Sequence, residues 1–325
     1  MKLIRAQTVE ILEGARIEHC RYAIVSHRWG DEEIEFQEFG TVSCRKKAGW
    51  KKVEHACRLA REQGYEYVWI DTCCIDKKSS AELSQAINSM FEWYQRAEEC
   101  FVFLTDVVST EPDQNFKRSD WFNRGWTLQE LLACKRATFY NKRYEAIGTK
   151  AKLAGHISDV TSIDAVYLQR GRDVKNIHDA SLAERMSWAA KRKTERPEDI
   201  AYCLLGIFEV NMPLLYGEGG TRAFLRLQLQ IIEHSDDESI LAWPEESCRN
   251  EDYPNPGLLA QHPRAFEYCA SIKPLHTRRH PPHTFTSRGL ELHYDLSLGL
   301  RDPRAGARQA CSHFTQVSCH RQRSV

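Results

Sequence analysis

Short apolar segments alternate with amphipathic ones through the first 140 residues of the chain. Four segments are apolar without a regular polar alternation: residues 21–26 (RYAIVS), 67–71 (YVWID), 101–106 (FVFLTD) and 137–140 (ATFY). Short runs of this kind are typical of strands that are buried on both faces of a sheet. Two of them end in an aspartate, and the first runs into the polar string HRWGD.

Helical periodicity separates these predicted strands. Residues 50–61 carry apolar side chains on one stripe and end before Gly64. Ser79 and Glu82 have the spacing of a capping box and predict the start of a second helix. A third helix is predicted over WTLQELL, residues 126–132. Alternation of strands and helices predicts an α/β fold with a parallel sheet flanked by helices.

From about residue 150 the pattern becomes mainly helical. A second capping box occurs at Ser181 and Glu184, Pro197 can open a helix, and residues 221–234 are amphipathic. The glycines of LLYGEGG precede that last helix but lack the Lys-Ser/Thr of a phosphate-binding loop, so they predict a turn. We expect an α/β domain at 1–150, a helical region at 151–245, and an irregular, partly disordered extension at 246–325.

Charge and cysteine usage narrow the class of protein. The 45 basic and 45 acidic residues balance, so nothing favours a nucleic-acid partner. No apolar run approaches the roughly 20 residues that span a membrane. The 12 cysteines are dispersed without a C-x-x-C motif, which predicts reduced core thiols and no metal site. These features predict a cytoplasmic protein without a membrane span.

The candidate chemistry lies where the predicted strands end. Ligands of parallel sheets collect beyond the carboxyl ends of the strands. Those ends carry Ser26, Arg28, Trp29 and Asp71. On the third predicted helix Glu130 faces away from the leucines, because residues repeat at 100°. We therefore expect these residues to share one edge of the sheet.

Structural roles are the alternative for each candidate. Glu130 can be a solvated surface glutamate, Trp29 and Trp126 core or interface anchors, Asp71 a cap, and Arg124 a member of a surface ion pair. His27 follows Ser26 directly, and adjacent residues of a strand point to opposite faces. This spacing argues against nucleophilic catalysis by the pair.

Three segments together resemble the fungal heterokaryon-incompatibility (HET) domain: residues 22–39, 64–94 and 124–140. Residues 185–219 resemble the segment that follows this domain in many fungal proteins. The resemblance implies a cytosolic protein that triggers cell death when incompatible fungal cells fuse. It also implies self-association or partnership with other HET or NLR-type signalling proteins. Arg28 departs from the family, which commonly has a small or polar residue there, and the chain after about Asp295 does not continue the pattern.

The order of elements is also similar to the TIR fold. Trp126, Leu128, Glu130 and Leu131 fall on its W-x-L-x-E-L helix. The resemblance implies a TIR-like, flavodoxin-like sheet and assigns Glu130 as the catalytic residue of NAD⁺ hydrolysis. NAD⁺ is then a substrate, and no cofactor is expected.

The chemistry of that reaction suits these residue types. Cleavage between nicotinamide and ribose passes through an oxocarbenium-like state, which a single carboxylate can stabilise. Trp29 or Trp126 could stack on a base, and Arg28 or Arg124 could bind the diphosphate. Asp71 could orient a hydroxyl, and Ser26 completes the substrate-binding candidates. Two hypotheses follow: an enzyme that depletes NAD⁺ on self-association, or a non-enzymatic adaptor in which Glu130 and its neighbours form an interface.

Overall fold

The computed structural model describes residues 1–14, 20–169, 176–244, 257–273, 284–286 and 289–291. Two compact units divide the chain, residues 1–279 and residues 280–325. In the described part of the second unit, β8 (Thr284–Thr286) pairs with β9 (Gly289–Glu291) in antiparallel register. The first unit contains the sheet and the helices discussed below.

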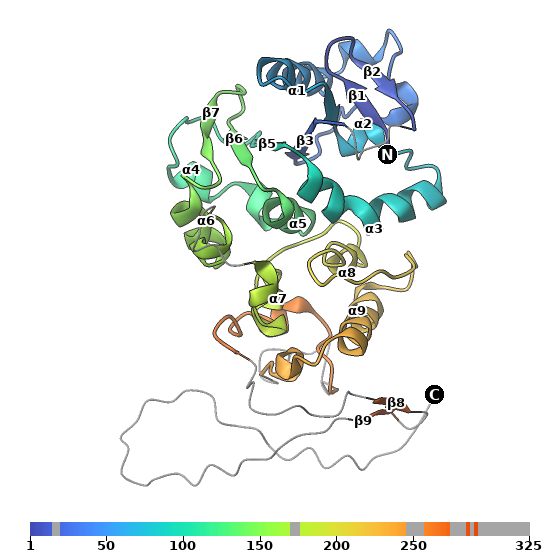
Figure 1. Cartoon of the computed structure of the whole chain (residues 1–325), viewed down its shortest axis with the longest axis vertical. Helices are drawn as coiled ribbons and strands as arrows, with labels where there is room; N and C mark the ends of the chain where they lie inside the picture. Colours follow the sequence, from blue (N-terminus) through green and yellow to red (C-terminus); the bar gives the residue numbers. More distant parts are fainter. Residues whose placement is uncertain (15–19, 170–175, 245–256, 274–283, 287–288, 292–325) are drawn as a thin grey trace. The chain divides into compact units, whose positions relative to one another are not determined.

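A sheet in the order β2-β1-β4-β3-β5-β6-β7 forms the framework of the first unit (Figure 1). Its four central strands are β4 (Tyr67–Trp69), β3 (Tyr22–His27), β5 (Glu99–Phe103) and β6 (Ala137–Tyr140). All three pairings among them are parallel, as the sequence predicted. Every residue of β3, β4 and β5 is buried, which explains the absence of polar alternation in these segments.

Three antiparallel strands flank the parallel core, and the sequence pattern did not predict them. They are β1 (Leu3–Arg5), β2 (Glu10–Leu12) and β7 (Ala146–Thr149). The strands predicted at 67–71 and 101–106 are also shorter than expected, ending at Trp69 and Phe103. Asp71 consequently opens the short helix α2 (Asp71–Cys74) instead of ending a strand.

Helices lie on both faces of the parallel core, as predicted. Helix α1 (Trp50–Glu62) connects β3 to β4, and α3 (Ser80–Arg96) connects β4 back to β5 across β3. Right-handed crossovers in these opposite directions place the two helices on opposite faces. Helix α5 (Trp126–Ala133) connects β5 to β6 and packs beside α3 (Figure 1). The short α4 (Gln114–Lys117) precedes it.

The serine N-caps of both predicted capping boxes are confirmed, but neither box is complete. The Ser79 side chain accepts a hydrogen bond from the backbone N–H of Glu82, and Ser181 does the same for Glu184 at α7 (Leu182–Ser187). These bonds satisfy amide donors that the first turn of a helix leaves without a partner. The Glu82 side chain does not complete the box, because it accepts from the backbone of Asp76 and pairs with Lys2.

The region after the sheet is helical, with α6 (Ala154–Thr161), α8 (Asp199–Tyr202) and α9 (Gly220–His234) in addition to α7. Residues 257–273 pack onto it. The Gln228 side chain of α9 bonds both the carbonyl and the N–H of Ala260, at 2.6 and 3.0 Å. The boundary expected near residue 245 lies outside the described residues, as does most of the expected 246–325 extension. These domain limits therefore stay predictions.

Two further features concern the class of protein: the length of its helices and the state of its cysteines. Where the structure describes the chain, none of its helices has the length and apolarity needed to cross a membrane. The following cysteines are buried and carry free thiols: Cys44, Cys57, Cys73, Cys74, Cys100, Cys134 and Cys203. Burial raises the pKa of the Cys57 and Cys73 thiols to about 12, which is the behaviour of core residues and not of reactive nucleophiles.

Candidate functional site

A hydrogen-bonded relay joins the end of β3 to α5. The Trp121 indole donates to Ser26 Oγ at 2.8 Å, and the Ser26 hydroxyl in turn donates to Glu130 Oε2. An indole N–H can only donate, so Ser26 must accept from Trp121 and is left to direct its own proton at the carboxyl group. Ser26 and Glu130, which the sequence predicted to share one edge of the sheet, are therefore in direct contact. Trp121 was missed, because nothing in its spacing distinguishes it from a core aromatic.

Glu130 lies inside the protein with 8% of its surface exposed. The alternative of a solvated surface glutamate is therefore wrong. Burial above all, together with the charge of Asp71, raises the pKa of Glu130 to about 8. The Ser26 hydrogen bond and the Arg124 charge oppose this shift without overcoming it. At neutral pH the carboxyl group therefore mostly holds its proton.

His27 points away from this relay, as the alternation of a strand requires. Its Nε2 lies 3.4 Å from Glu33 Oε1, and its Nδ1 lies 3.7 Å from Asp71 Oδ1. Both distances are long for hydrogen bonds. Burial, reinforced by the charge of Lys52, lowers the pKa of His27, so the ring is neutral. Lys52 is itself buried and forms an ion pair with Glu33.

Trp29 and Asp71 also meet, as predicted. The Trp29 indole donates to Asp71 Oδ2 at 2.7 Å, and 39% of Trp29 is exposed, so it is not a core anchor. The ammonium of Lys77 lies 3.4 Å from the centroid of the Trp29 ring. Asp71 connects this aromatic face to the relay, since its charge acts on Glu130. The edge of the sheet thus gathers Ser26, Trp29, Asp71 and Glu130.

The remaining candidates face other partners. Arg28 is exposed and pairs with Asp120. Arg124 Nη1 lies 4.0 Å from Glu195 Oε1, and the charge of Arg124 also acts on Glu130. The Trp126 indole donates to Asp199 Oδ2 of α8 at 3.1 Å. The tryptophan one turn before Glu130 therefore connects α5 to the helical region.

The helical region holds the N-terminal end of α5 through several more bonds. The Gly125 N–H donates to the Lys193 carbonyl at 2.8 Å. Arg192 donates to the Arg124 carbonyl at 2.8 Å and to Thr127 Oγ1 at 3.0 Å. A Cβ at Gly125 would approach Thr194 Cγ2 to 2.6 Å, so the two segments are in close contact. Sequence reasoning missed Arg192, since a lone arginine in a charged segment resembles a surface residue.

The glycine-rich turn before α9 is confirmed as a turn. The N–H groups of Gly217 and Gly219 donate to Glu198 Oε1, at 2.9 and 3.0 Å. A carboxylate of the chain itself therefore occupies the position where a bound anion would accept from such a loop. These donors fit a structural role for the turn.

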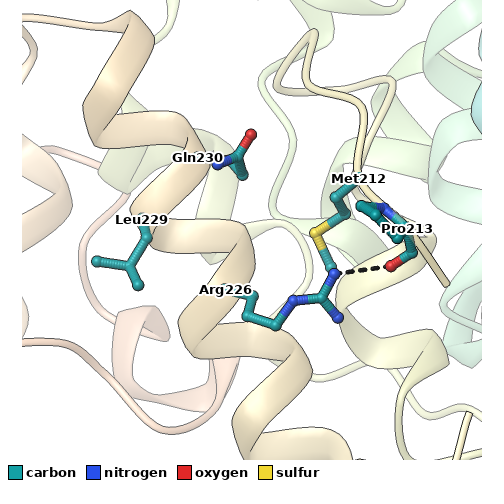
Figure 2. A pocket seen from close by; sticks show the side chains of 5 residues that line it. All are labelled: Met212, Pro213, Arg226, Leu229 and Gln230. Atoms are coloured by element: carbon teal, nitrogen blue, oxygen red, sulfur yellow. Dashed lines mark hydrogen bonds between the residues drawn. The ribbon is translucent and has the colours of Figure 1, made fainter. Parts of the chain in front are cut away.

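A pocket of about 250 Å³ is lined by residues outside the predicted site (Figure 2). It is lined by Met212, Pro213, Arg226, Leu229 and Gln230. Arg226 closes one side by donating to the Pro213 carbonyl at 2.7 Å. None of the residues at the edge of the sheet lines it. In the parts of the chain described, no cluster of three or more histidine, cysteine or acidic side chains is placed to hold a metal ion.

Residues 22–113 match the family model of the heterokaryon incompatibility protein (HET). This part of the chain thus belongs to the HET family. Of the edge residues, Ser26, Trp29 and Asp71 lie inside the matched range, and Glu130 follows it. The chain is also 42% identical over 220 residues to the vegetative incompatibility protein HET-E-1 of Podospora anserina. That alignment covers 65% of this chain but 16% of the relative, so the chain spans a small part of its relative's length. No solved structure matches the chain.

Proposed function

We propose that this HET protein acts in heterokaryon incompatibility as an effector that triggers programmed cell death in fungal non-self recognition. The family match and the incompatibility protein that resembles the chain support this role. We further propose that the effector hydrolyses NAD⁺ at the carboxyl edge of the sheet. This second proposal rests on the hydrogen bond between Ser26 and Glu130.

The position of that pair in the fold supports a ligand site. The parallel strands run in the order β4-β3-β5-β6, so the connection from β3 runs to one side of it and the next connection returns from β4 to β5 on the other side. Ligands of doubly wound sheets bind at such a switch point, beyond the carboxyl ends of the strands. Ser26 and His27 are the last residues of β3. The same strand order underlies our proposal of a TIR-like, flavodoxin-like sheet.

The proposed reaction breaks the bond between the nicotinamide nitrogen and C1′ of ribose. The electron pair leaves on nicotinamide, water adds to C1′, and the water proton passes to Glu130 or to solvent. A cationic substrate beside Glu130 would favour ionisation of its carboxyl group, which then stabilises the oxocarbenium-like state. Asp71 would orient a ribose hydroxyl, and Arg28 or Arg124 would exchange its present partner for the diphosphate. Because Glu130 is buried in the single chain, we propose that self-association opens the site.

A non-enzymatic adaptor is the second candidate, and the burial of Glu130 favours it. A neutral carboxyl group that bonds a neighbouring hydroxyl is well suited to hold α5 against β3. In this proposal the HET domain signals through contacts with other proteins, and Glu130 keeps its interface in shape.

Incubation of the concentrated full chain with NAD⁺ separates the two candidates. We expect the unmodified chain to release nicotinamide, and Glu130→Gln to reduce the rate by about 100-fold or more, since it keeps the shape but removes the charge. Glu62→Gln is the matched control, because Glu62 is an exposed glutamate that pairs with Arg58 on the surface. The rate should rise with pH through about 8, as Glu130 ionises.

Thermal unfolding of each variant verifies that loss of the rate is not loss of the fold. Killing activity that persists in cells expressing Glu130→Gln, together with no nicotinamide release from any variant, would establish the adaptor instead.

A further inference from the structure

A lysine occupies the exposed face of the tryptophan at the edge of the sheet. Lys77 Nζ lies 3.4 Å from the centroid of the Trp29 ring, well within the range of a cation–π contact. In the described part of the chain no carboxylate oxygen lies within 4.0 Å of this ammonium group. The indole face is therefore the main partner of Lys77, which is half-buried.

The surroundings of Trp29 favour a cation at this position. Its N–H donates to the Asp71 carboxylate, which increases the electron density of the indole and so the attraction of its face for a positive charge. Burial lowers the pKa of Lys77, and the charges of Asp71, Glu35 and Glu33 oppose this. An anion bound here would face the same three acidic groups, so Lys77 is poorly placed to recruit a phosphate.

Two polar atoms near Trp29 are buried without a hydrogen-bond partner: Asp71 Oδ1, on the carboxylate that accepts from the indole, and His27 Nε2, which lies 3.4 Å from Glu33 Oε1. The side chain of His27 is 1% exposed, and that of Asp71 is 20% exposed. Buried polar atoms normally have partners, and an orphan next to an exposed aromatic ring indicates a place for a ligand. Asp71 Oδ1 can accept from a hydroxyl group of that ligand.

We propose that the Trp29 face, backed by Asp71, binds a planar organic cation, and that Lys77 occupies this face until the ligand displaces it. The inference rests on the proposed function when it names the cation as the pyridinium ring of NAD⁺. The ring would then stack on Trp29 while the attached ribose reaches Asp71. Reduced NAD, whose nicotinamide ring carries no charge, would lose most of this attraction.

Binding of two small probes to the full chain tests the proposal without any turnover. 1-Methylnicotinamide carries the pyridinium charge, whereas nicotinamide has nearly the same shape and none. We expect calorimetry to show tighter binding of the charged probe. Lys77→Met should tighten it by about tenfold, because the competing ammonium is gone. Lys78→Met is the matched control at the adjacent exposed position and should change nothing.

Trp29→Leu should abolish binding of the charged probe, and Trp29→Phe should retain a weaker part of it, since it keeps a ring without the bond to Asp71. Equal affinity for both probes would overturn the proposal, and so would weaker binding in Lys77→Met. Preferential cation binding without NAD⁺ hydrolysis would overturn only the proposed reaction. Hydrolysis without preference for the charged probe would overturn only the cation face.

Discussion

Glu130 and Glu198 are buried to a similar degree, at 8% and 5% exposed, but their carboxyl groups behave in opposite ways. Burial raises the pKa of Glu130 to about 8. Backbone N–H donors, its own first and then those of Gly219 and Gly217, lower the pKa of Glu198. Glu198 is covered by a surface turn that supplies these donors, whereas Glu130 is a buried residue of α5 with the Ser26 hydroxyl group as its main donor.

This difference shows that covering a carboxylate does not by itself set its charge. Several backbone donors stabilise the ionised form, and a single hydroxyl does not offset the loss of water. Glu198 thus fulfils a structural role in its ionised state. The Glu130 carboxyl group is mostly neutral at pH 7, which is common for groups that change protonation during function.

The largest effect should come from Glu130→Gln and its dependence on pH. The pKa of Glu130 is about 8 in the folded chain and near the ordinary glutamate value of 4.5 when unfolded. The stabilising contribution of the protonated group is complete below about 4.5 and is lost as pH rises through about 8. Glutamine cannot lose a proton. Between about pH 5 and pH 9 the free energy of unfolding of Glu130→Gln should therefore rise by on the order of 3 kcal/mol relative to that of the unmodified chain. Urea unfolding at both pH values measures this, and parallel curves would contradict it.

Glu198→Ala should lower the free energy of unfolding by about 2 kcal/mol at neutral pH, because two glycine N–H groups lose a charged acceptor. The pKa of Glu198 is lowered by folding, so its contribution is present above its unfolded pKa and is lost as pH falls through the folded value. The difference in the free energy of unfolding between Glu198→Ala and the unmodified chain should therefore become smaller in acid. The pH dependence expected at Glu130 has the opposite sign. Glu198→Gln keeps an acceptor and should lose about half as much. A deficit that is independent of pH would contradict the ionised role.

Ser26→Ala should raise the pKa of Glu130 further, by about one unit, since the hydroxyl donor that favours the ionised form is removed. Titration of the glutamate side-chain carbons by nuclear magnetic resonance measures the shift. Trp121→Phe should move it less, because Trp121 acts only through Ser26. An unchanged titration in Ser26→Ala would mean that the relay does not polarise the carboxyl group.

The smallest expected effect is at the turn itself. Gly219 has φ of +84°, a backbone conformation in which a residue with a side chain is strained. Gly219→Ala should therefore lower the free energy of unfolding by about 1 kcal/mol. A methyl group added at Gly155 of α6 would meet open space, and the backbone there is helical, so Gly155→Ala should be neutral or slightly stabilising. Thermal unfolding compares the two, and equal effects would show that the turn tolerates rearrangement around Glu198.

Much of the framework follows from local pattern. The runs at β3, β4, β5 and β6, the stripe of α1 and the caps at Ser79 and Ser181 are all present where the sequence predicted them. Their signals repeat within a few residues, so no distant contact is needed to recognise them. The strands β1 and β2 were missed because three residues are too short to show a period.

The candidate site divides in the same way. That Ser26, Asp71 and Glu130 converge could be predicted, because parallel strands with intervening helices bring their carboxyl ends to one edge. That Trp126 instead reaches Asp199, and that Arg192 holds α5, depends on how the helical region packs. No periodicity within either segment encodes that packing.

The order and type of the central elements, the convergence of the edge residues and the resemblance to the HET family were determined by the sequence itself, since each rests on spacing along the chain. The neutral state of Glu130, the ionised state of Glu198 and the lysine over Trp29 were decided only by the tertiary structure. Charge and pKa depend on which groups from distant segments surround an atom and how much water they exclude, and those neighbours exist only once the chain has folded.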